Sequence, residues 1–146
     1  VDWLRRGEVV GVFPEATISQ SFEVKDFKTG AVRMAAEAGV PVVPMITFGG
    51  QRLWTKGRKR EMTRGTLVAL TVGEPITVTG DDDPLEATAH LRSVMQGLYD
   101  QTIEDYEPKP APGAWWWPAR YGGGAPSLQA MRDQEAQDRA AREGGE

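Results

Sequence analysis

The apolar positions in the first half of the chain fall into alternating strand-like and helix-like segments. Residues 9–13 and 40–48 are short apolar runs rich in β-branched side chains, which is typical of buried strands. Between them, residues 29–38 carry small apolar side chains at helical spacing, and Gly39 provides a helix stop. A strand, a helix and a strand in this order predict two parallel strands joined by a right-handed crossover.

A third strand and a long helix follow in the sequence. Residues 66–72 form another β-rich apolar run, and Pro84 after three aspartates predicts the first turn of a helix. We expect this helix to end near Tyr106. Its predicted apolar face consists of Leu91, Val94, Met95, Leu98 and Thr102. The pattern therefore predicts an α/β fold: a partial, mostly parallel sheet with helices packed on it.

The composition changes at residue 107. Prolines alternate with small or charged residues, and three tryptophans at 115–117 and three glycines follow. Residues 127–142 suit either a short polar helix or disorder. We therefore divide the chain into a domain over residues 1–106 and an extended or disordered arm over residues 107–146. For the tryptophans, packing against the domain's own surface is favoured over contact with a membrane interface.

Composition and charge narrow the functional classes. The 146 residues suffice for one modest domain, and the absence of cysteine excludes a thiol nucleophile. No apolar run has the length of a membrane span, so we expect these residues to meet a membrane only at its surface. The net charge is −4, yet residues 52–64 are basic. The cations of this segment are Arg52, Lys56, Arg58, Lys59, Arg60 and Arg64. Such a segment is either a solvated loop or a site for an anionic partner.

Polar side chains follow the first predicted strand. Residues 13–19 contain a carboxylate, two hydroxyls and turn amides, which are groups that can hold a polyol or a phosphate. Lys25 and Lys28 come next, and the N-terminus of the following helix adds its dipole. The alternative is a turn whose polar side chains bond only to nearby backbone groups. The residue pattern by itself favours this alternative.

Three motifs change that balance because they occur in a fixed order at compatible spacing. They are Phe13-Pro14-Glu15-Ala16-Thr17-Ile18-Ser19, Phe27-Lys28-Thr29-Gly30 and Val40-Pro41-Val42-Val43-Pro44. Together they resemble the second half of the glycerolipid acyltransferase domain of the 1-acylglycerol-3-phosphate acyltransferase type. The resemblance is strong over about residues 9–48, extends to about residue 105 and does not reach the tail.

The resemblance implies where the acyl acceptor binds. The implied substrate-binding residues are Phe13, Pro14, Glu15, Ala16, Thr17, Ser19 and Lys28. Two positions depart from the family motif, since its usual Gly is Ala16 and its usual Arg, associated with the acceptor phosphate, is Ile18. An isoleucine cannot pair with a phosphate. We expect that charge from Lys25, Lys28 or the basic segment; otherwise the acceptor is a different one.

The resemblance also implies a catalytic dyad. In this family a histidine, held by an aspartate five residues later, is expected to deprotonate the acceptor hydroxyl for attack on an acyl thioester. The single histidine here is His90, and the residue five positions later is Met95, so we assign no catalytic residue. The chain begins at Val1 within a helix-like pattern. We therefore expect it to be part of a longer protein that carries the dyad before Val1.

The activity implied by the resemblance is acyl transfer in phospholipid synthesis. The donor is acyl-CoA or an acyl-carrier protein, and the acceptor is a lysophospholipid. We expect peripheral location at the cytoplasmic face of an anionic membrane, no cofactor, no metal and no nucleic acid, and no activity of this chain alone. The alternative function is a non-enzymatic module that binds anionic membranes or nucleic acid through residues 52–64.

Overall fold

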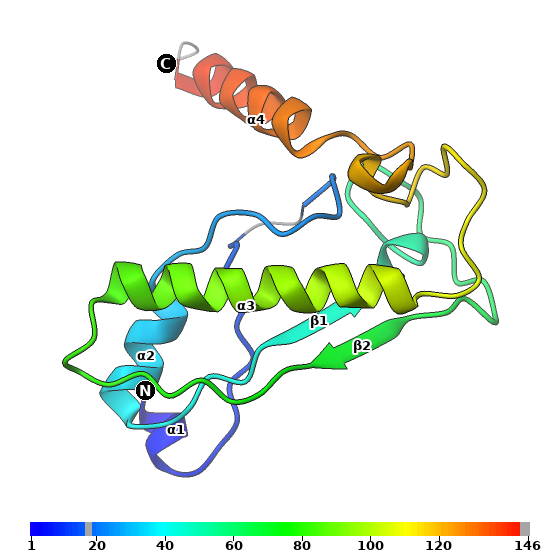
Figure 1. Ribbon diagram of the computed structural model, residues 1–146. Coiled ribbons are helices and arrows are strands. Elements are labelled where there is room, and N and C mark those ends of the chain that lie inside the picture. Colours follow the sequence, from blue (N-terminus) through cyan, green and yellow to red (C-terminus); the bar gives the residue numbers. More distant parts are fainter. Residues whose placement is uncertain (17–18, 144–146) are drawn as a thin grey trace. The chain divides into compact units, whose positions relative to one another are not determined.

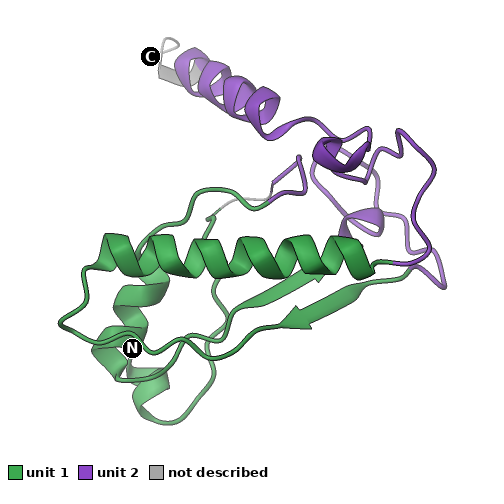
Figure 2. Ribbon diagram, viewed as in Figure 1, with its two compact units in different colours: residues 1–18, 24–48, 67–106 green, residues 19–23, 49–66, 107–146 purple. Residues whose placement is uncertain are grey.

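The computed structural model describes residues 1–16 and 19–143. The elements, with η denoting a 3-10 helix, are α1 (Asp2–Arg5), α2 (Gly30–Ala38), β1 (Met45–Phe48), η1 (Gly50–Arg52), β2 (Ala69–Val72), α3 (Pro84–Asp105), η2 (Ala119–Tyr121) and α4 (Leu128–Glu143) (Figure 1). The chain divides into two compact units that alternate along the sequence (Figure 2). Unit 1 comprises residues 1–18, 24–48 and 67–106, and unit 2 comprises residues 19–23, 49–66 and 107–146.

Unit 1 is built on a two-stranded sheet covered by α3. β1 and β2 pair antiparallel, with Phe48 opposite Ala69, and α3 runs alongside both strands (Figure 1). The ring of Phe48 meets the rings of Tyr99 and Tyr106 edge to face, at centroid distances of 6.1 and 5.4 Å. Because two strands alone are marginal in water, this packing on α3 is what stabilises the sheet.

The start of α3 follows from its sequence. Asp83 caps the helix, and its Oδ1 accepts hydrogen bonds from the amides of Leu85 and Glu86 at 2.8 and 3.0 Å. Pro84 occupies the first turn, where its missing N–H removes no intrahelical bond. The predicted helix and its aspartate cap are therefore confirmed.

The buried face of α3 is only partly the predicted one. The buried residues of the helix are Thr88, Leu91, Tyr99, Thr102 and Ile103. Leu91 and Thr102 were expected, whereas the pattern misses Tyr99, which carries a polar hydroxyl on a largely apolar body. A second cluster joins Leu91 to Val32 of α2 and Val78. Through these contacts α3 holds both the sheet and α2.

The predicted strand at residues 9–13 and its parallel pairing are wrong for the described part of the chain. Val9 is 95% exposed and Phe13 is 88% exposed, and neither lies in a strand. A strand exists through ladder hydrogen bonds to a neighbour, and among residues 1–16 and 19–143 no strand pairs with this segment. The expected α/β fold with helices packed on a partial sheet is confirmed, but the pair that forms is antiparallel.

The sheet has one covered and one open face. Ile46 and Phe48 are buried, while Met45, Leu70 and Val72 are about half exposed, at 49%, 57% and 55%. Side chains alternate between the two faces of a strand, so the open face is mostly apolar, with Thr47 as its polar member. In the tail, the helical alternative holds: α4 spans most of the segment that suited either a polar helix or disorder. No helix among the described residues is both long and apolar enough to cross a bilayer.

Gly39 gives a test of this fold. It follows α2 with φ +68°, a left-handed conformation in which an added Cβ meets nothing within 4 Å. Gly39→Ala should therefore lower the free energy of unfolding by roughly 1 kcal/mol through backbone strain alone. Gly97→Ala, inside α3 and also in open space, should instead raise it by roughly 0.5–1 kcal/mol. Urea unfolding followed by circular dichroism measures both changes in the free energy of unfolding. Changes in the same direction for the two variants would contradict the assigned backbone conformations.

Candidate functional site

The segment from Phe13 to Lys28 leaves unit 1 and returns to it as a loop. The Lys28 amide donates to the Pro14 carbonyl at 2.8 Å, which brings the two ends of the loop together. Three residues before Lys28, the Lys25 amide donates to Oε1 of Glu15 at 3.0 Å. The carboxylate that the sequence singled out thus spans the loop and orders its backbone.

Arg92 of α3 also contacts this loop. Arg92 Nε donates to the Lys25 carbonyl at 2.9 Å and lies 3.8 Å from a carboxylate oxygen of Asp26. Lys25 itself is buried. Arg92 is missed by sequence reasoning, because 67 residues separate it from Lys25 and nothing in its local pattern marks it.

Ala16 lies in a turn at the start of the loop. Its amide donates to the Phe13 carbonyl at 3.1 Å, and its φ is +57°. This left-handed conformation costs an alanine roughly 1–2 kcal/mol and a glycine almost nothing. The resembled family has glycine at this position, a residue that adopts such a φ without strain.

The other predicted site residues lie in different surroundings. Pro14 is half-buried, while Lys28 is exposed beside it. Ser19 belongs to unit 2, where its hydroxyl bonds that of Ser21 at 2.8 Å and lies 3.7 Å from the sulfur of Met131. Thr17 and Ile18 fall outside the described residues. The assignment of these residues to a substrate remains a prediction.

The surroundings of Glu15 shift the pKa of its carboxyl group. Partial burial raises its pKa above the usual glutamate value, while the hydrogen bond from the Lys25 amide and the positive charges of Lys25 and Arg92 pull that pKa down. The net shift is upward. Desolvation therefore outweighs the favourable contacts, and the ionised carboxylate needs the loop amide as its partner.

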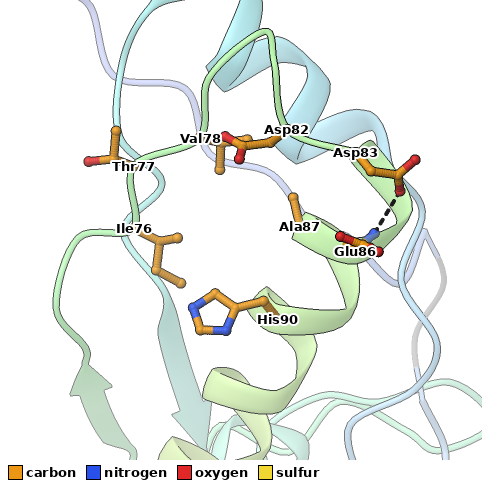
Figure 3. Close-up of a pocket in the computed structure, with 8 residues that line it drawn as sticks. All are labelled: Ile76, Thr77, Val78, Asp82, Asp83, Glu86, Ala87 and His90. Carbon is orange, nitrogen blue, oxygen red and sulfur yellow. Dashed lines mark hydrogen bonds between the residues drawn. The ribbon is translucent and has the colours of Figure 1, made fainter.

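A separate pocket of about 250 Å³ lies between the start of α3 and the chain before it (Figure 3). Its lining contains three carboxylates and the single histidine: Ile76, Thr77, Val78, Asp82, Asp83, Glu86, Ala87 and His90. Asp82 accepts from the amide and hydroxyl of Thr79 at 2.7 and 2.8 Å, and these bonds lower its pKa. Since Asp83 caps α3, two of the carboxylates shape the turn before the helix.

His90 lies at the exposed surface of α3, as predicted, and its ring projects toward Ile76 (Figure 3). Five residues later, Met95 packs against the core cluster of unit 1. Among residues 1–16 and 19–143, no group of three or more His, Cys, Asp or Glu side chains has the arrangement of a metal site. His90 therefore lacks the aspartate five residues later that the family resemblance implies for the catalytic histidine.

Unit 2 brings the basic segment together with the tryptophans. The guanidinium of Arg52 lies 4.4 Å from the ring centroid of Trp116, and that of Arg58 lies 3.8 Å from Trp115. Phe22 meets Trp115 edge to face at 6.2 Å. Trp115 and Trp116 thus pack on arginines of the chain itself, while buried Trp117 donates its indole N–H to the Tyr121 carbonyl at 3.1 Å. The sequence pattern gives no sign of these contacts, because fifty residues lie between the basic segment and the tryptophans.

Comparisons with known proteins agree on one family. Residues 1–47 match the family model described as Acyltransferase. The 1-acyl-sn-glycerol-3-phosphate acyltransferase of Escherichia coli (strain K12) is 35% identical over 91 residues, covering 60% of this chain and 35% of that protein. A protein of the same description from Chlamydomonas reinhardtii is 39% identical over 64 residues, covering 44% of this chain and 19% of that one.

The same family appears among solved structures. The crystal structure of the 1-acyl-sn-glycerophosphate (LPA) acyltransferase PlsC from Thermotoga maritima matches with a TM-score of 0.58 and 28% identity. The match covers 74% of this chain and 44% of that one. The chain spans about a third of the length of the Escherichia coli relative, and less of the Chlamydomonas one.

Glu15 gives a pH-dependent test. Its raised pKa means that the folded state binds this proton more tightly than the unfolded state, so ionisation of Glu15 weakens folding. Glu15→Gln keeps an oxygen for the Lys25 amide but cannot ionise. The free energy of unfolding of the wild type, relative to that of this variant, should fall as pH rises from about 4.3, the unfolded value, through the raised pKa of the folded state. Above that pKa the difference should become constant. Urea midpoints at a series of pH values measure it. A relative gain for the wild type over that range would show that the charges of Lys25 and Arg92 dominate instead.

Proposed function

Since the chain belongs to the acyltransferase family, we propose that it is part of an enzyme that transfers a fatty acyl group to a lysophosphatidate-type acceptor. The observation that carries the proposal is the closed loop of residues 13–28. The Lys28 amide donates to the Pro14 carbonyl and the Lys25 amide donates to Glu15, so both hydrogen bonds end on the family's Phe-Pro-Glu motif. The match to the family falls on residues 1–47, which contain this loop and not the basic segment. A non-enzymatic binding module is for that reason not favoured.

The reaction is attack of the acceptor hydroxyl oxygen on the carbonyl carbon of an acyl thioester, from acyl-CoA or an acyl-carrier protein. An ester C–O bond forms, the C–S bond breaks, the thiolate leaves, and a general base takes the hydroxyl proton. By the family resemblance that base is a histidine other than His90. In this scheme the described chain contributes acceptor binding, with Glu15 ordering the loop and Lys28 offering its ammonium to the acceptor phosphate.

We propose further that the enzyme works as a peripheral protein on the cytoplasmic face of an anionic membrane. Lys56, Arg60 and Arg64 of the basic segment are exposed. A basic side chain near an anionic bilayer contributes about 1 kcal/mol of attraction.

Lys28→Ala, in a longer protein that carries the family's histidine and aspartate, tests the acceptor site. It should raise KM for lysophosphatidate roughly tenfold through loss of one charge-assisted contact, the lower end of the range because Lys28 is exposed. KM for an unphosphorylated monoacylglycerol should not change. Steady-state kinetics with both acceptors measures the difference.

Two further variants sharpen this experiment. Arg33→Ala removes an exposed cation of α2 and should leave both KM values unchanged, while Lys28→Arg should recover most of the loss. Equal effects of Lys28→Ala on both acceptors would show that this residue does not read phosphate. Absence of acyl transfer by the longer protein itself would contradict the proposed activity.

The membrane proposal predicts that Lys56, Arg60 and Arg64→Gln together weaken binding of this chain to phosphatidylglycerol vesicles by about a hundredfold at low salt. Cosedimentation at rising salt measures it. The matched control replaces the exposed Arg33, Arg132 and Arg139, which removes the same charge elsewhere. Equal losses in the two triple variants would show that net charge, and not the basic segment, sets the affinity.

A further inference from the structure

Unit 2 contains a second pocket, of about 250 Å³, that the acceptor loop does not use. It is lined by Gln51, Arg52, Arg58, Lys59, Glu61 and Trp115. The lining carries three cations and one carboxylate, a formal excess of two positive charges. A pocket with this balance suits a small dianion better than a neutral ligand or a monovalent anion.

Two arginines of the pocket are held in place by indole rings. Arg58 lies over Trp115 at 3.8 Å and Arg52 over Trp116 at 4.4 Å. Stacking uses the faces of a guanidinium, while its N–H donors lie in the plane of the group and point outward from the edge. The two rings therefore order the arginines in a way that remains compatible with bidentate contacts to an anion.

The backbone around the pocket is ordered as well. Gln51 Oε1 accepts from the Gly49 amide at 2.8 Å, and Gln51 Nε2 donates to the Trp116 carbonyl at 3.1 Å. At the base of the loop, the Glu61 amide donates to the Leu53 carbonyl at 2.9 Å. The cations are thus carried by a closed loop that is joined to the tryptophan segment. Such an arrangement reduces the entropy lost on binding.

We propose that this pocket binds the phosphomonoester group of a substrate. A phosphate dianion matches the charge excess, and its oxygens match the forked donors of arginine, with Lys59 as an additional point charge. The choice of ligand rests on the proposed function, which supplies two sources of this group: the glycerol phosphate headgroup of the acceptor and the nucleotide of a coenzyme A donor. The pocket volume suits one such group and not a length of nucleic acid.

Isothermal titration of this chain at low ionic strength tests the pocket, because screening would hide the contact at high salt. The probes are glycerol 3-phosphate for the headgroup and adenosine 3′,5′-bisphosphate for the nucleotide, with glycerol and adenosine as uncharged references. We expect a phosphate probe to bind and the references not to bind. The tighter of the two phosphate probes identifies the source.

Matched variants separate the pocket from general charge attraction. Arg58→Gln with Lys59→Gln should weaken the better probe at least about tenfold, since two charged contacts are lost. Lys56→Gln with Arg60→Gln removes equal charge from the same loop outside the pocket, and should change the affinity less than about threefold. Trp115→Leu keeps every charge but removes the ring under Arg58, and should also weaken binding. Circular dichroism confirms that each variant is folded.

Equal losses in the two double variants, or no binding of either phosphate probe, would overturn the proposal. The titration does not depend on acyl transfer, so the two hypotheses fail separately. If a phosphate probe binds this chain but the longer protein transfers no acyl group, the phosphate pocket stands and the proposed function is wrong. If the longer protein transfers acyl groups but no phosphate probe binds this pocket, the proposed function stands and the pocket assignment is wrong.

Discussion

The packing of α3 on β1 and β2 is the interaction on which unit 1 depends. A two-stranded sheet has too little apolar area to persist alone, and α3 supplies the missing face. Aromatic contacts from Phe48 are supplemented by polar ones along the same seam. The hydroxyls of Thr102 and Thr71 are 2.7 Å apart, and the Tyr106 hydroxyl donates to the Leu67 carbonyl at 2.8 Å. Register and helix position are therefore fixed together.

The candidate acceptor loop depends on the same helix. Arg92 of α3 donates a hydrogen bond to the Lys25 carbonyl, and the Lys25 amide donates one to the Glu15 carboxylate. A carboxylate with a raised pKa is thereby positioned by a helix whose main contacts are made elsewhere, with the sheet and α2. The hydrogen bonds add to apolar contacts of the loop itself, since Val24 is buried and Phe27 packs against the core cluster of unit 1.

Local signals in the sequence correctly predicted the end of α2 and the start of α3. The Asp83 cap, Pro84 and the Gly39 stop act over a few residues, and the helices begin and end where these residues place them. The sequence motifs also singled out Glu15 and Lys28, whose assignment to a substrate remains a prediction. What the pattern could not provide was pairing over long distances: the antiparallel register, the reach of Arg92, and the stacking of Arg58 on Trp115. The apolar run at residues 9–13 shows the same limit, since apolar composition alone does not supply a partner strand.

The two units share the chain in an interleaved order, which limits how the protein can be divided. The chain passes between units after residues 18, 23, 48, 66 and 106, so neither unit is a continuous stretch of sequence. A truncation after residue 106 would look like the removal of a tail. It would instead take Trp115 and Trp116 away from Arg58 and Arg52, and Arg120 away from Glu23, 3.3 Å from it. The residues that remain of unit 2 would be left as two unsupported insertions in unit 1, one of them inside the loop that carries Glu15.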